Sequence, residues 1–149
     1  MRGKALFWWS WLLVVSGGVV AAGLVMLLAP GLTRLLFSLL VFASPSAIDR
    51  FGQQAVGYTT LAHGVLGAVM VGWGLALLTI VAGPLRHCSH EAWTTCAVSV
   101  AAWFIADTAF SLATGFWQNA ILNIVLAILF GLPLAGIRGT CEGRPERFA

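Results

Sequence analysis

Charged residues are scarce in this sequence. Its 149 residues include eight Lys or Arg and five Asp or Glu, which is 9% of the chain, while 60% of the residues are hydrophobic. A soluble domain of this size needs far more polar side chains to cover its surface, and about 25% charged residues is usual. The composition excludes a soluble enzyme, a nucleic-acid-binding domain and a disordered chain. It predicts an integral membrane protein, for which the lipid bilayer is the expected partner.

The motifs of common catalytic and metal sites are also missing. The sequence has no glycine-rich phosphate-binding motif, no serine nucleophile paired with a base, and no CxxC among Cys88, Cys96 and Cys141. The segment His87–His90 reads HCSH, which is either a weak metal site or, as we prefer, a solvated loop. A haem would need His63 and a ligand from another chain. We therefore assign no catalytic residue and no metal ligands, and the identity of any cofactor stays unknown.

Long uncharged stretches dominate the sequence instead. No charge occurs from Ala5 to Thr33 or from Phe51 to Leu85, and Asp107 is the single charge between Ala92 and Ile137. A helix needs about 20 apolar residues to cross the hydrocarbon core of a bilayer. The pattern predicts an all-α, integral membrane four-helix bundle in a single transmembrane domain, residues 1–149. The four spans are expected at about residues 6–28, 58–81, 92–113 and 117–137.

The connection between the first two spans is long and apolar. Residues 31–43 are too apolar for a solvated loop and too short to span, so we expect a helix in the membrane interface with Arg34 reaching the headgroups. The first span could alternatively be a signal peptide, because residues 1–4 are basic. Its apolar run is longer than the hydrophobic region of most signal peptides, which favours a span.

The basic residues set the expected orientation. With the N-terminus inside, the inner side has six basic residues and the outer side has only Arg34 and Arg50; the six are Arg2, Lys4, Arg86, Arg138, Arg144 and Arg147. Cytoplasmic loops are enriched in Lys and Arg. Both termini are therefore expected in the cytoplasm of a bacterial inner membrane, where the three cysteines would stay reduced.

Small residues recur at four-residue spacing in two spans. A small-residue ladder, defined as Gly64, Ala68, Gly72 and Ala76, runs along the second span, and Gly17 and Ala21 repeat the spacing in the first. Such ladders let two helix backbones approach closely in lipid. The two sets are expected either to face each other within one chain or to form the seam of a dimer.

Polar residues within the spans gather at one depth, in the outer half of the membrane. The candidate polar cluster consists of Asp107, His63, Asn119, Asn123, Arg50, Trp103 and Ser111. We expect Asp107 to be satisfied by at least two other segments, through Asn119 or Asn123 and through His63 or Arg50. Intramembrane ionisable groups are costly and often functional. The cluster is either a structural network or the lining of a cavity for a lipid headgroup, a quinone, a small amphiphile or, less well, a metal.

The layout resembles small four-span bacterial membrane proteins of the DoxX-like kind. The resemblance lies in Asp49–Phe51, in HGVLGAVMVGWG from His63 to Gly74, and in AWFIADTAFSLATGFWQNAILNIV from Ala102 to Val125. It implies a helical bundle in a bacterial inner membrane and an accessory role beside redox complexes. It carries over no catalytic residue.

Two classes of function follow from the sequence. The first is a non-enzymatic membrane subunit that forms a homo-oligomer or joins a larger membrane complex. The second is a binder or transporter of a small lipophilic ligand, such as a lipid or quinone, at the polar cluster. An enzyme acting on a lipid comes third, since no catalytic motif supports it.

Overall fold

The computed structural model describes residues 3–141, and these form helices joined by short turns. In chain order the elements are α1 (Gly3–Leu28), α2 (Pro30–Phe42), the 3₁₀ helix η1 (Ile48–Phe51), α3 (Gln53–Ala82), the 3₁₀ helix η2 (Pro84–His87), α4 (His90–Ala113) and α5 (Trp117–Cys141). Helices α1, α3, α4 and α5 are each long and apolar enough to cross a membrane. This confirms the all-α fold class, the four spans and the shorter helix between the first two.

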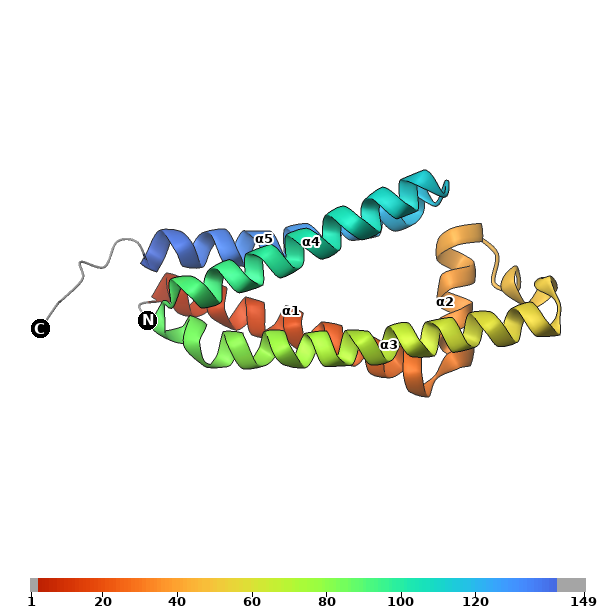
Figure 1. The fold of residues 1–149 in the computed structure, drawn as a ribbon, viewed down its shortest axis with the longest axis horizontal. Helices are drawn as coiled ribbons and strands as arrows, with labels where there is room; N and C mark the ends of the chain where they lie inside the picture. The colour runs from red at the N-terminus through yellow and green to blue at the C-terminus, as the bar shows by residue number, and fades with distance from the viewer. Residues whose placement is uncertain (1–2, 142–149) are drawn as a thin grey trace, which may run out of the picture.

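The four long helices form two pairs (Figure 1). Helix α1 packs along α3, and α4 and α5 form a hairpin that contacts α1 through α5. The pairs lie together at the end that holds the start of α1, η2 and the end of α5, which we call the terminal end. They separate towards the opposite, distal end, where α2 runs across the direction of the other helices.

Proline and glycine residues set the turns between the helices. Pro30 has no backbone N–H and begins α2, and the bend falls at Ala29 with φ −127° and ψ 63°. Helix α3 ends before Gly83, and Pro84 begins η2. The turn between α4 and α5 needs a left-handed residue, which Gly115 supplies with φ 83°. Helices α1, α3 and α4 therefore end next to Pro30, Gly83 and Gly115.

Helices α1 and α3 approach each other closely, and this contact uses glycines outside the predicted ladder. A Cβ added to Gly67 would lie 2.6 Å from the Gly23 carbonyl oxygen, and one added to Gly74 would lie 2.7 Å from Val20 Cγ2. By contrast, a Cβ on Gly17, Gly64 or Gly72 would meet nothing within 4 Å. The expectation that the ladder packs against Gly17 and Ala21 within one chain is therefore wrong. The face that meets α1 is the one carrying Gly67 and Gly74.

Tryptophan side chains hold the terminal end together. The Trp9 indole Nε1 donates to the Val81 carbonyl at 2.7 Å, where the break at Gly83 ends α3. Trp93 Nε1 donates to the Leu134 carbonyl at 2.8 Å and so links α4 to α5. The guanidinium groups of Arg86 and Arg138 lie over the rings of Trp9 and Trp93, at 5.2 and 4.9 Å from their centroids. Cations and indoles pair favourably in this way.

The cysteines depart from expectation at the same end. Cys88 is disulfide-bonded, whereas the buried Cys96 is a free thiol. The expectation that all three cysteines stay reduced is therefore wrong for Cys88. Disulfides persist mainly in oxidising compartments, so this bond bears directly on the orientation of the protein.

Candidate functional site

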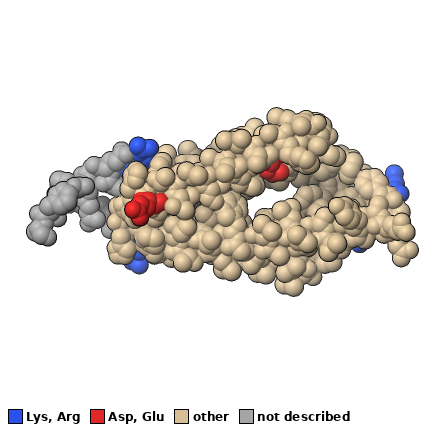
Figure 2. Space-filling view, in the orientation of Figure 1, with Lys and Arg blue, Asp and Glu red and all other residues tan. Residues whose placement is uncertain are grey.

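An opening passes through the distal half of the molecule, between the α4–α5 hairpin and α3 (Figure 2). Two contacts between the helix pairs limit it. Towards the terminal end, Trp73 packs against Trp103 and Phe130, with ring centroids 5.8 and 6.1 Å away. Towards the distal end, the Gln118 Nε2 atom donates to the Val41 carbonyl at 3.1 Å and joins α5 to α2. The opening thus lies between an aromatic contact and a polar one.

The α4–α5 wall holds a hydrogen-bonded group centred on Asp107. Asn123 and Asn119 donate through Nδ2 to Asp107 Oδ2 at 2.8 and 3.2 Å. Asn119 Nδ2 also donates to Ser111 Oγ at 2.8 Å, and Asn123 Nδ2 lies 3.3 Å from Thr108 Oγ1. Asn123 is only 1% exposed. We call these five residues the Asp107 network.

The sequence produces this network through helix periodicity and a short turn. Asp107 and Ser111 are four residues apart on α4, and Asn119 and Asn123 are four apart on α5, so each pair shares a helix face. The turn at Gly115 brings the two faces together. Figure 2 shows acidic atoms at the rim of the opening on the side of the hairpin. The other acidic residue of α4, Glu91, lies away from the opening, in the first turn of the helix at the terminal end.

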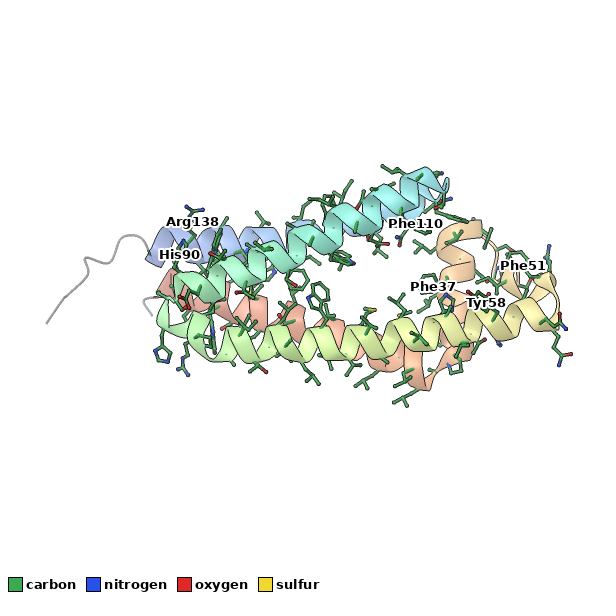
Figure 3. All side chains as sticks on the ribbon, viewed as in Figure 1. Phe37, Phe51, Tyr58, His90, Phe110 and Arg138 are labelled. Carbon is green, nitrogen blue, oxygen red and sulfur yellow. The ribbon has the colours of Figure 1, made fainter. Side chains whose placement is uncertain are left out.

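The opposite side of the opening is built where α2 crosses α3. Figure 3 labels Phe37 at this crossing, and the His63 ring stacks on it with centroids 4.4 Å apart. His63 Nδ1 is buried and has no hydrogen-bond partner among the described residues. Arg34 joins the elements here, because its Nη1 donates to Thr60 Oγ1 at 3.3 Å and its Nε lies 3.6 Å from Asp49 Oδ1. Arg34 therefore takes part in contacts with α3 and η1, and its position at the lipid headgroups stays a prediction.

The structure brings together four of the seven residues predicted for the polar cluster: Asp107, Ser111, Asn119 and Asn123. The other three lie elsewhere. His63 stacks on Phe37, Trp103 packs against Trp73, and the exposed Arg50 donates to Ser46 Oγ at 3.3 Å. Among the described side chains, the partners of the Asp107 carboxylate come from α5 alone. The expectation of a second segment contributing His63 or Arg50 is therefore wrong.

Sequence reasoning missed the role of α2 in the site. Phe37 and Arg34 on this helix contact α3 through His63 and Thr60. Arg34 was the available signal, since a lone charge in an otherwise apolar helix needs a partner. Its partners could not be read from spacing, because they lie on elements far along the chain.

The site offers hydrogen-bonding groups and aromatic surface. Within residues 3–141, no three His, Cys, Asp or Glu side chains gather closely enough to hold a metal ion. The elements around the opening instead carry an anchored carboxylate, a buried imidazole nitrogen and a layer of Trp and Phe rings. Such a surface suits a molecule with a small polar head and an apolar body.

Comparison of the chain with protein-family models, with curated proteins and with solved structures finds no match. The likeness to DoxX-like proteins therefore stays a resemblance in layout. What the four apolar helices establish is a small multi-pass membrane protein.

Proposed function

We propose that this protein is a non-enzymatic membrane protein that binds a small amphiphile, such as a lipid or a quinone, in the opening between the α4–α5 hairpin and α3. The supporting observation is the opening itself, which lies between polar side chains at the depth of the predicted spans. Within a bilayer such a space fills with a molecule from the membrane. Its walls then select the occupant.

The polar groups at the opening favour an occupant with a hydrogen-bonding head. A buried polar atom without a partner costs about 1–3 kcal/mol. His63 Nδ1 is such an atom, and its ring is already fixed against Phe37. Because Nδ1 has no exposed surface in this structure, a ligand hydroxyl or carbonyl would have to enter beside the ring to bond this nitrogen. That bond would remove the cost, while Trp73 and Trp103 would contact the apolar body.

The proposal predicts that His63→Leu lowers the amount of a retained small molecule. Wild-type protein purified in a mild detergent should release an amphiphile that mass spectrometry of the solvent extract identifies. His63→Leu should reduce its retention about tenfold, which corresponds to the loss of about 1.4 kcal/mol from one hydrogen bond. His87→Leu is the matched control, because His87 is exposed at the terminal end. Equal retention by the two variants would contradict the proposal, as would wild-type protein without any bound amphiphile.

Self-association, or docking as a subunit of a membrane complex, is the second candidate. The small-residue ladder supports it, because Ala68, Gly72 and Ala76 are exposed and a Cβ on Gly64 or Gly72 would meet no atom within 4 Å. Small residues facing lipid leave room for the backbone of another helix. A stoichiometric protein partner in native mass spectrometry, in place of a small molecule, would favour this function.

We further propose that the terminal end faces the cytoplasm of a bacterial inner membrane. Lys4, Arg86 and Arg138 lie at this end; Arg2, Arg144 and Arg147 are outside the described residues but adjoin it in the sequence. This distribution follows the positive-inside rule. The disulfide of Cys88 favours the opposite orientation, because thiols stay reduced in the cytoplasm.

A protein with Cys88 as its sole cysteine separates the two orientations. The variant Cys96→Ser with Cys141→Ser cannot form an internal disulfide, so the reactivity of Cys88 then depends on the side of the membrane alone. We expect no labelling by an impermeant maleimide in intact cells and full labelling after permeabilisation. Labelling from outside would reverse the orientation and place the native disulfide in the oxidising compartment.

A further inference from the structure

A second concave surface lies on the α4–α5 hairpin, in the half nearer the terminal end. It is a groove of about 560 Å³. Small residues from both helices form much of it, among them Ala97, Ala101, Ala127, Gly131 and Ala135. Trp93 and Arg138 line its terminal end, and Phe104 is the last lining residue towards the distal end.

The length of this groove matches one leaflet of a bilayer. At about 1.5 Å per residue, the lining from Trp93 to Phe104 on α4 covers about 16 Å and that from Ala127 to Gly139 on α5 about 18 Å. The hydrocarbon core of a bilayer is about 30 Å thick, so one leaflet contributes about 15 Å. A transmembrane helix packed on the hairpin would need a seam along the whole span. An acyl chain of a single lipid needs only this length.

The groove carries a cation where the lipid headgroup would lie. Arg138 is exposed in the last turns of α5, and its guanidinium lies over the Trp93 ring, 4.9 Å from the centroid. The ring is fixed in turn by its hydrogen bond to the Leu134 carbonyl. We propose that this groove binds one acyl chain of an anionic phospholipid, with the lipid phosphate on the Arg138 guanidinium. This site is separate from the opening and does not depend on the function proposed for it.

Native mass spectrometry of protein released from nanodiscs of equal phosphatidylglycerol and phosphatidylcholine content tests the site. We expect wild-type protein to retain phosphatidylglycerol in preference to phosphatidylcholine. Arg138→Gln should lower that preference about fivefold, because one basic residue near the surface contributes about this factor. Arg86→Gln is the matched control, since Arg86 is also exposed at this end and also lies over an indole ring. Equal retention of the two lipids by wild-type protein would overturn the proposal, as would an equal loss of preference in both variants.

Filling the groove tests the acyl-chain part of the proposal. A Cβ on Gly131 would meet nothing within 4 Å, so Gly131→Leu should fold normally and lower lipid retention about tenfold. Ala101→Leu fills the groove from α4 and should act in the same way. Gly18→Leu is the control, because Gly18 is exposed on α1 with equal room for a side chain. Unchanged lipid retention in both groove variants would overturn the proposal, as would loss of a protein oligomer with lipid retention intact.

Discussion

Replacing Asp107 by leucine should lower the free energy of unfolding by about 2–4 kcal/mol, whereas Asp107→Asn should change it by less than about 1 kcal/mol. Leucine leaves the amide groups of Asn119 and Asn123 without their shared acceptor, and each unpaired buried group costs about 1–3 kcal/mol. Asparagine keeps an oxygen where those amides donate. No basic side chain among the described residues pairs with Asp107, so the asparagine variant strands no cation.

Unfolding of detergent-solubilised protein by heat or by a denaturing detergent measures these two variants. Glu91→Leu is the control, because it removes an exposed acid from the first turn of the same helix and should have a small effect. Equal damage from the asparagine and leucine variants would show that the charge of the carboxylate, and not its role as an acceptor, stabilises the network. Normal stability of both variants with loss of a retained ligand would instead make Asp107 a binding residue.

The features that sequence reasoning predicts well here are local ones. The spans follow from uncharged runs of sufficient length, and their ends follow from Pro30, Gly83 and Gly115. The bonds from Asn119 and Asn123 to Asp107 follow from the four-residue spacing of the two asparagines and a tight turn between neighbouring helices. In both cases the information lies within one helix or one hairpin.

The features it misses depend on how distant segments rotate towards each other. The prediction places His63 in the same half of the membrane as Asp107, but depth does not determine which way a helix face points. The structure turns His63 towards Phe37 on α2. The disulfide of Cys88 is missed because the basic residues place the cysteines in the cytoplasm, where thiols are expected to stay reduced.

The contact between α1 and α3 shows the same limit most clearly. Helix α3 contains glycines on several faces, so its sequence offers more than one run of small residues. The run at strict four-residue spacing is the most conspicuous, yet Gly67 and Gly74, seven residues apart, are the buried ones. Spacing indicates that a close approach exists, and only the packing of Gly67 against Gly23 determines which face makes it.

Gly67→Leu should therefore prevent normal packing of α1 on α3, with a loss of about 3 kcal/mol or more in the free energy of unfolding. Overpacking a tight site costs about 1–3 kcal/mol when neighbours can move, and here the first obstacle is backbone, because a Cβ at Gly67 would lie 2.6 Å from the Gly23 carbonyl oxygen. Gly64→Leu is the matched control on the same helix. A Cβ there meets nothing within 4 Å, so its effect should stay within about 0.5 kcal/mol.

Thermal unfolding in detergent, together with size-exclusion chromatography, separates the outcomes. Equal destabilisation of the monomer by the two variants would contradict the packing described here and restore the small-residue ladder as the intrachain seam. A Gly64→Leu protein that keeps its monomer stability but loses an oligomer would instead assign the ladder to contacts between chains. The two glycines are about one turn apart on the same helix, so the comparison varies only whether α1 lies against the added side chain.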